Sequence, residues 1–313
     1  MPLHPDLEAF LELANEPSSG RPKMHQMTAE QARAAYDRST LALDQPGNEL
    51  PIEMLELQTR DGSKLPARLY RGCAADSPAP TLLFFHGGGY VLGGLGSHDS
   101  LCRDLAHGTP CNVIAVDYRL APEHRFPTAF FDAQDALAWL RVHGPEHGLD
   151  ARKLTIGGDS VGGTLATALC IAERNAQRPQ PILQMLLYPC TAARQDSASH
   201  ERLASGYLLE RETLDWMFGQ YLRSDTDRRD WRFAPLEAED LDRLAPVHLV
   251  LAEYDPLMDE GKLYAERLEA AGVGVSLHIY NGMVHDFARL GCITEEADTL
   301  RHDLCQALAQ AFR

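Results

Sequence analysis

The sequence lacks the features that would place it in a membrane or export it from the cell. No apolar stretch among its 313 residues approaches the ~20 residues that a spanning helix needs, so no stable membrane insertion is expected. The first residues carry no basic segment followed by an apolar run. Because a secretory signal is therefore not visible, we expect a cytoplasmic protein.

Paired cysteines and basic clusters are also missing. The seven cysteines are odd in number and scattered, and no two stand at CxxC spacing, which argues against disulfides and zinc sites. We interpret them as small buried side chains in a reducing compartment. The formal charge is −16, and no cluster of lysine and arginine reverses it locally, so nucleic acid is not an expected partner.

Apolar runs alternate with helical stretches from residue 52 onward. Eight segments are predicted to be strands: 52–57, 65–70, 82–85, 113–116, 154–156, 183–187, 247–251 and 275–280. The first two are expected to pair around the turn Asp61-Gly62. Continuous apolar strands separated by helices indicate an α/β fold, with a mostly parallel eight-stranded sheet covered by helices on both faces.

Two regions depart from this alternation. Residues 1 to about 50 are predicted to be helical, with a capping box from Thr28 to Gln31. No strand is expected between Tyr188 and Val247, where helical spacing connects Leu214, Met217, Phe218 and Tyr221. Because ligands bind at the carboxyl end of a parallel sheet, we interpret these regions as a helical cap over a site. The prediction is one domain, 1–313, with a cap formed by about 1–50 and about 190–235.

Ser160 is the candidate nucleophile. It lies in Gly158-Asp159-Ser160-Val161-Gly162, directly after an apolar strand and before a helix. A sharp turn between strand and helix exposes the hydroxyl, and it crowds the positions two residues before and after the serine, where glycine fits. This G-x-S-x-G pattern is typical of the nucleophile elbow of α/β hydrolases. Asp159, beside the serine, is interpreted as a structural residue or a helix-start charge.

The serine needs a general base and an acid, and in this fold class their order is serine, acid, histidine. Three histidines stand late enough, but His278 lies inside the last strand and His302 in the final helix, predicted over 297–312. His285 lies in the loop just past the last strand, after Asn281-Gly282-Met283-Val284, and is the predicted base. Asp255 follows the preceding strand and is the predicted acid, ahead of Asp259, which is expected inside the next helix. Asp255 can also cap that helix.

A run of three glycines supplies the candidate oxyanion hole. His86-Gly87-Gly88-Gly89 comes directly after the third strand, and glycines let backbone N–H groups approach a ligand closely. The predicted donors are the amides of Gly87, Gly88 and Val161. Loss of one such donor typically lowers the rate by about 10²–10³.

Together these motifs resemble the hormone-sensitive-lipase-like esterases, in their bacterial branch, within the α/β-hydrolase fold. The resemblance extends over nearly the whole chain and rests on five blocks: His86 to Tyr90, Tyr118 to Phe126-Pro127, Gly158 to Gly163, Asp255-Pro256-Leu257, and His285 with Phe287. It implies a carboxylesterase that acts on short- to medium-chain esters through an acyl-enzyme and needs no metal or organic cofactor. Related enzymes are often dimers, so a homodimer is also expected.

Three positions depart from the family pattern. Val161 replaces the usual alanine, and its larger side chain narrows the pocket while its N–H can still donate. Asp286 stands where glycine is usual, and its carboxylate is expected to raise the pKa of His285. Gly94 replaces a frequent acidic residue, with no assigned consequence.

Other candidates remain open at the level of sequence. The acyl pocket is predicted to include Tyr90, Tyr188, Tyr207, Trp216 and Phe218, although packing within the cap explains the cap aromatics equally well. Arg119 and Glu123 are interpreted as a buried pair that braces a loop. The same triad would serve an amidase, a lactonase or a carbamate hydrolase. A non-catalytic ligand receptor on this fold is disfavoured because every part of the triad is retained.

Overall fold

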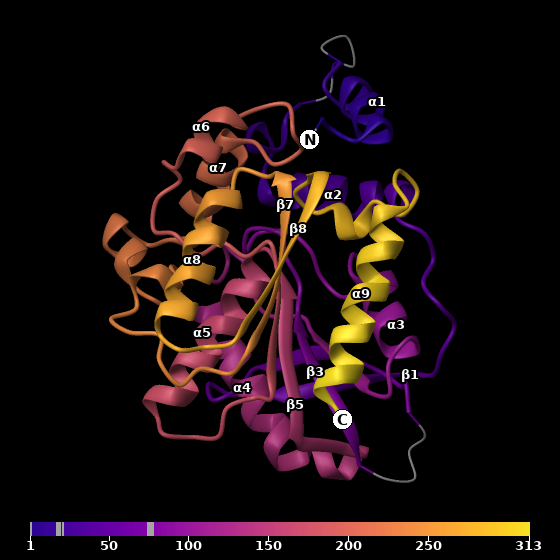
Figure 1. Cartoon of the computed structure of the whole chain (residues 1–313), viewed down its shortest axis with the longest axis vertical. Helices are drawn as coiled ribbons and strands as arrows, with labels where there is room; N and C mark the ends of the chain where they lie inside the picture. Colours follow the sequence, from indigo (N-terminus) through magenta and orange to yellow (C-terminus); the bar gives the residue numbers. More distant parts are fainter. Residues whose placement is uncertain (1, 17–19, 21, 74–77) are drawn as a thin grey trace.

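The computed structural model describes residues 2–16, 20, 22–73 and 78–313 and is built around one eight-stranded sheet (Figure 1). The strands lie in the order β1-β2-β4-β3-β5-β6-β7-β8. β2 is antiparallel to both β1 and β4, and every other neighbouring pair is parallel. The strand bounds are β1 Ile52–Gln58, β2 Lys64–Tyr70, β3 Ala79–Phe85, β4 Asn112–Val116, β5 Leu149–Asp159, β6 Leu183–Leu187, β7 Val247–Tyr254 and β8 Val275–Val284.

All eight predicted strands are confirmed, and so is the mostly parallel sheet. Four strands, β3, β5, β7 and β8, exceed their predicted bounds by three residues or more. β5 begins five residues earlier than predicted; its first half includes Asp150, Arg152 and Lys153, lacks an apolar run and pairs with β3 only through Leu149. β8 extends to Val284, so that His285 follows its last residue directly.

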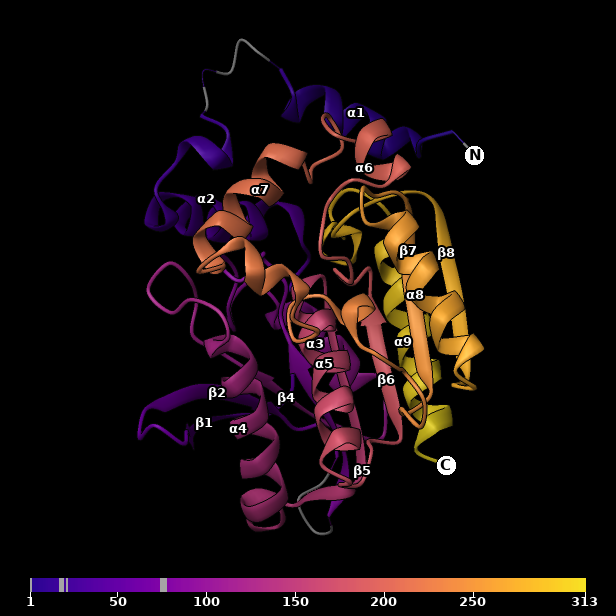
Figure 2. The same ribbon diagram turned by 90° about the vertical axis from the view of Figure 1, so that its left-hand side faces the viewer.

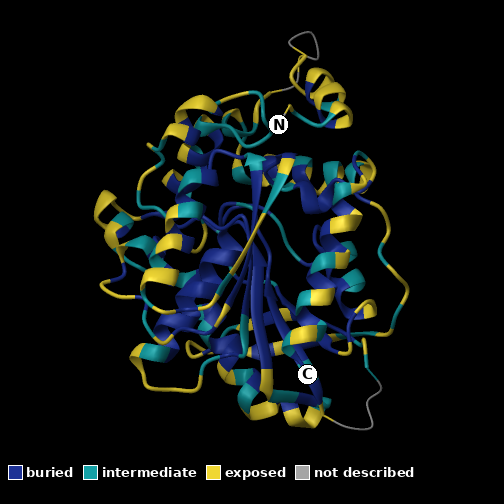
Figure 3. Cartoon of the chain, in the orientation of Figure 1, coloured by how far each residue is buried: buried dark blue, intermediate teal, exposed yellow. Residues whose placement is uncertain are grey.

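Helices cover both faces of the sheet, as predicted. On one face lie α4 (Thr128–His143), α5 (Val161–Asn175) and α8 (Met258–Ala270), and on the other lie α3 (Asp99–His107) and α9 (Glu296–Ala311) (Figure 2). Each face has its own core, because side chains alternate along a strand: Leu83 and Phe85 of β3 join one apolar cluster, and Leu82 and Phe84 join the other. The central strands are therefore buried on both sides (Figure 3).

The N-terminal region is only partly helical. It contains α1 (Pro5–Ala14), a short 3₁₀ turn (Met24–Gln26) and α2 (Ala29–Leu43), whereas residues 44–51 form no helix. Residues 1, 17–19 and 21 of the predicted helical region lie outside the described residues. The predicted capping box is present: the N–H of Gln31 donates to Thr28 Oγ1 at 3.2 Å, and the N–H of Thr28 donates to Gln31 Oε1 at 3.1 Å.

The segment between β6 and β7 contains no strand, as predicted. It holds α6 (Ala198–Arg202) and α7 (Arg211–Tyr221), with two 3₁₀ turns, Asp225–Arg229 and Pro235–Glu237. The predicted apolar stripe of α7 is buried, since Leu214, Met217, Phe218 and Tyr221 are each at most 5% exposed. Figure 2 shows α6 and α7 beside α1 and α2 at the carboxyl end of the parallel strands.

The predicted pairing of Arg119 with Glu123 is wrong. The Arg119 guanidinium binds Asp132 of α4 at 2.6 Å and Asp61 at 2.8 Å, whereas Glu123 binds Arg33 of α2 at 2.6 Å. The two side chains, both on the loop between β4 and α4, therefore bind different neighbours. Each one ties this loop to a separate element, so both remain structural residues.

Among the described residues, no helix combines the length and the apolar character needed to cross a membrane. Of the seven cysteines, five are buried, Cys73 is partly buried and Cys292 is exposed; all are free thiols.

Candidate active site

Ser160 lies at the sharp turn between β5 and α5. Its backbone angles are φ +52° and ψ −124°, a conformation that side-chain-bearing residues seldom adopt and that costs about 1–3 kcal/mol. The flanking glycines are required by close packing: a Cβ on Gly158 or on Gly162 would collide with the carbonyl oxygen of Phe85. The serine N–H donates to the Leu187 carbonyl at 2.8 Å, which fixes the turn against β6.

The predicted base and acid lie beside this serine. His285, directly after β8, has its Nε2 3.1 Å from Ser160 Oγ, and its Nδ1 is 2.6 Å from Asp255 Oδ2. Asp255 follows β7 directly, and its other oxygen accepts the N–H of Leu257 at 2.8 Å. All three side chains are buried, with exposed fractions of 7% for Ser160, 5% for His285 and 1% for Asp255. The carboxyl ends of three strands thus bring together three residues that are far apart in the sequence.

The residues that were considered but not chosen as base or acid make other contacts. His278 is exposed on β8 and contacts Ser276. His302 is exposed on α9 and contacts Gln306. Asp259 lies in the first turn of α8, where its carboxylate accepts the N–H of Ser199 at 2.7 Å.

Charge around the base favours its protonated form. Burial alone lowers the pKa of His285, but the Asp255 carboxylate outweighs this effect, helped by Asp286 and Asp159, and the net pKa lies above the usual value. The direction expected for Asp286 is therefore supported. The Asp286 carboxylate also binds Arg289 at 2.6 Å, so that the charge beside the histidine is held in place by a buried guanidinium.

The glycine run differs from the prediction at its first amide. The N–H of Gly87 donates to Asp159 Oδ1 at 3.0 Å, so it is not free to bind an oxyanion. Gly88 and Gly89 have φ angles of +109° and +62° and line the same cavity as Ser160 and Val161. Gly87 was among the predicted donors because neither spacing nor composition shows which N–H of the run the buried carboxylate of Asp159 accepts.

A cavity of about 810 Å³ opens beside the serine. Its wall combines residues of α2, the loop before α7 and α7 itself, so both regions predicted as cap contribute. The apolar part is aliphatic and includes Leu43, Leu92, Leu208, Leu209, Leu214 and Met217. At one side lie Tyr36, Asp286 and Arg289, which give this part of the wall a polar character.

The five aromatic residues predicted for the pocket are not among the described residues that line this cavity. Three of them pack inward instead: Tyr90 stacks on Tyr221 with ring centroids 3.8 Å apart, Phe218 meets Phe233 edge to face, and Trp216 packs against the core. Tyr207 contacts Tyr254, with ring centroids 5.5 Å apart and the ring planes tilted by 33°. The stripe on α7 did contain lining residues, Leu214 and Met217, but they were predicted only as its packed face.

Tyr188 has a different position from the other four. It is fully buried directly after β6, and its ring meets the His285 imidazole edge to face, with centroids 4.8 Å apart. Its side chain therefore contacts the candidate base rather than the cavity.

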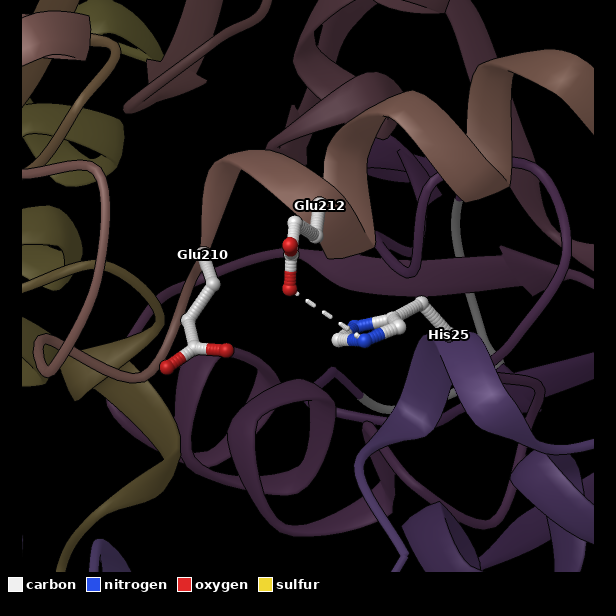
Figure 4. A group of neighbouring side chains, drawn as sticks. All are labelled: His25, Glu210 and Glu212. Atoms are coloured by element: carbon white, nitrogen blue, oxygen red, sulfur yellow. Dashed lines mark ion pairs between the residues drawn. The ribbon is translucent and has the colours of Figure 1, made fainter.

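One group of side chains has the composition of a metal site. His25, Glu210 and Glu212 place ligand atoms within 4.8 Å of one another, where the 3₁₀ turn before α2 faces the start of α7 (Figure 4). Glu212 contacts the histidine at 3.3 Å, and Lys23 Nζ contacts both Glu210 oxygens at 2.9 and 2.8 Å. These contacts join the two regions predicted to form the cap, and they account for the group without a metal ion.

Comparison with known proteins gives consistent matches. A family model described as the alpha/beta hydrolase fold matches residues 82–289. An ethyl acetate hydrolase of Pseudomonas putida is 46% identical, with 99% of each chain covered. Carboxylesterase NlhH of Mycobacterium tuberculosis is 35% identical over 82% of each chain. The crystal structure of a thermostable esterase from Pseudomonas putida superimposes with a TM-score of 0.94 at 32% identity, covering 100% of this chain and 98% of the other.

Proposed function

The chain belongs to the alpha/beta hydrolase family, and on this basis we propose that it is a serine carboxylesterase that hydrolyses short- to medium-chain esters of small alcohols. The observation that carries the proposal is the continuous hydrogen-bonded series Ser160–His285–Asp255 beside an aliphatic cavity. A serine hydroxyl in contact with a histidine that a carboxylate orients is the arrangement that acyl transfer requires.

In the proposed mechanism, His285 Nε2 removes the Ser160 proton as Oγ attacks the ester carbonyl. Asp255 accepts the Nδ1 proton in a hydrogen bond, which keeps Nε2 free to act as the base and stabilises the imidazolium that forms. His285 then protonates the leaving alcohol, and an acyl-enzyme remains on Oγ. A water molecule activated by the same histidine releases the acid and restores the serine.

The developing oxyanion needs N–H donors that bind no other acceptor. We assign this role to the amides of Gly88, Gly89 and Val161, because no hydrogen bond of these amides to another group occurs among the described residues, in contrast to that of Gly87. Gly89 thus replaces Gly87 in the predicted set. The three residues line the cavity together with Ser160, which supports this assignment.

Cavity size and wall chemistry support the proposed substrate class. A volume of about 810 Å³ lies in the range of pockets that hold small molecules, and an aliphatic wall stabilises a short hydrocarbon chain. The Pseudomonas putida relative is named for the hydrolysis of ethyl acetate, a short ester.

We also propose that residues of about 1–50 and about 190–235 act as a cap. We further propose that the enzyme is cytoplasmic and forms a homodimer. Size-exclusion chromatography with light scattering would test the homodimer.

The proposed function is tested by comparing purified wild-type protein with Ser160→Ala on p-nitrophenyl esters and on a matched series of alkyl acetates. We expect turnover by the wild type and its loss in the variant. Turnover that survives the substitution would contradict the assignment of the nucleophile. Faster hydrolysis of anilides, lactones or carbamates would point to one of the related acyl reactions, and tight binding without turnover would indicate a receptor.

A further inference from the structure

A second serine–histidine–aspartate group lies behind the nucleophile. His98, the residue before α3, is 1% exposed, and its Nε2 is 3.2 Å from the carboxylate of Asp159. Its Nδ1 is 2.9 Å from Ser97 Oγ. None of these three side chains lines the cavity, so they do not meet substrate.

Hydrogen-bond accounting fixes one proton of His98. A carboxylate only accepts, so His98 Nε2 must donate to Asp159. On the other side of the ring, Ser97 Oγ accepts the N–H of Gly94 at 3.0 Å and lies 3.1 Å from the Gly94 carbonyl. The ring is thus held between Ser97 and Asp159, with its Nε2 proton directed to the carboxylate.

The charge of Asp159 agrees with this assignment. Burial raises the pKa of Asp159, but the neighbouring His98 outweighs the burial, and the net pKa lies below the usual range. Burial lowers the pKa of the neighbouring His86 to about 3, and its Nδ1 donates to the Gly87 carbonyl. His98 is therefore the histidine that holds the buried Asp159 carboxylate.

The Asp159 carboxylate that His98 holds also contacts the glycine run. One Asp159 oxygen accepts the N–H of Gly87, which turns the first peptide of the run away from the serine. The next two residues have positive φ angles that bring the chain back along the cavity. Gly87 and Asp159 pack closely here, since a Cβ on Gly87 would collide with the Asp159 carboxylate.

We propose that His98 is a positioning residue for the oxyanion hole: its Nε2–H holds the Asp159 carboxylate, which fixes the glycine run at Gly87. This inference rests on the proposed function, because it assigns a role within the same reaction. A leucine in place of His98 would leave the Asp159 carboxylate without its partner. The carboxylate would then shift, and the donors beyond Gly87 would shift with it.

The test compares His98→Leu with His98→Gln, whose amide can still donate to Asp159 and accept from Ser97. We expect His98→Leu to lower kcat by about 10–100-fold, less than the 10²–10³ typical of a donor lost outright, with KM within about twofold. Affinity for a trifluoromethyl ketone, which forms a tetrahedral adduct with the serine, should fall by the same factor. His98→Gln should recover most of the loss in both measurements.

His248→Leu is the matched control. His248 is also a buried histidine, 7% exposed, but it lies at the start of β7 and contacts His278, away from the glycine run. Equal losses of kcat in the two leucine variants, or a loss in KM alone, would overturn the proposal. So would a ketone affinity that does not follow kcat.

A second pair of variants tests the positioning role if His98→Leu does not fold. Asp159→Asn keeps an oxygen for the Gly87 N–H and should retain kcat within about tenfold at the plateau of the pH profile, whereas Asp159→Ala should lose about 10²-fold or more. Equal activities in these two variants would refute the positioning role. Absence of turnover in the wild type would refute the proposed function itself, so the two failures are distinguishable.

Discussion

Replacement of Asp255 by asparagine tests the proposed mechanism because it should move one proton from one nitrogen of His285 to the other. The two carboxylate oxygens have different partners: Oδ1 accepts the Leu257 N–H at 2.8 Å, and Oδ2 lies 2.6 Å from His285 Nδ1. Asparagine has only one acceptor oxygen, and the Leu257 N–H requires it. The amide NH₂ is then forced to face His285 Nδ1. The imidazole must accept there, so its proton moves to Nε2.

A proton on Nε2 disables the base, because this nitrogen is the one 3.1 Å from Ser160 Oγ. The equivalent carboxylate-to-amide change in a serine protease lowers kcat by about 10⁴, which corresponds to roughly 5.4 kcal/mol of activation free energy. We expect a loss of the same order here, with KM changed by less than about threefold, since the aspartate lies behind the histidine and does not contact the cavity.

The assay is steady-state hydrolysis of p-nitrophenyl butyrate, with Asp259→Asn as the matched control. Asp259 lies four residues further along, and its carboxylate contacts Ser199 rather than the histidine. The control variant should keep kcat within about threefold of wild type. An Asp255→Asn variant that retained a tenth of wild-type kcat, or an equal loss in both variants, would refute the reasoning about the tautomer.

Four further outcomes follow from the structure. Asp286→Asn should move the acidic limb of the kcat/KM profile to lower pH, because Asp286 raises the pKa of His285, and this base works only in its neutral form. An acidic limb at unchanged or higher pH would contradict this. Met217→Ala should enlarge the cavity and favour longer chains by up to about fourfold in kcat/KM per newly buried methylene, at ~0.8 kcal/mol each; an ester series with an unchanged profile would argue against it. Gly162→Ala should lower the free energy of unfolding in urea by about 1–3 kcal/mol or more, since its Cβ would collide with the Phe85 carbonyl, whereas Gly96→Ala, with nothing within 4 Å, should be nearly neutral. Activity should persist in EDTA, and a loss restored by added metal would reveal a metal requirement.

Sequence patterns were sufficient for the sheet and for choosing three residues that the structure brings together as the proposed triad. Strands such as β3 and β4 are buried on both faces, and such burial requires continuous apolar runs that are visible in the sequence. Asp255 and His285 could be chosen because each lies in the loop just past a predicted strand, and the carboxyl ends of parallel strands meet at one edge. These predictions depend only on local composition and on chain order.

The side-chain predictions that failed concerned the partner of a polar or aromatic group. Whether the Gly87 N–H faces a substrate or Asp159 depends on a carboxylate 72 residues away in sequence. Arg119 could pair with any nearby acid, and the fold supplied Asp132 and Asp61. Tyr90 could face the cavity or the core, and stacking on Tyr221 decided for the core. Such choices depend on tertiary contacts, which spacing in the sequence does not encode.

The backbone conformation of the site also depends on tertiary contacts. Ser160 and Tyr188 both have positive φ angles, +52° and +37°, which their own side chains disfavour by about 1–3 kcal/mol each. Each donates its N–H to the neighbouring strand, Ser160 to Leu187 at 2.8 Å and Tyr188 to Val250 at 2.6 Å, so the sheet hydrogen bonds continue one residue past the strand end. These bonds hold the strained turns that aim the serine hydroxyl and the tyrosine ring at His285. Local propensity predicts the opposite conformation, because the energy that stabilises the turns comes from the adjacent strands.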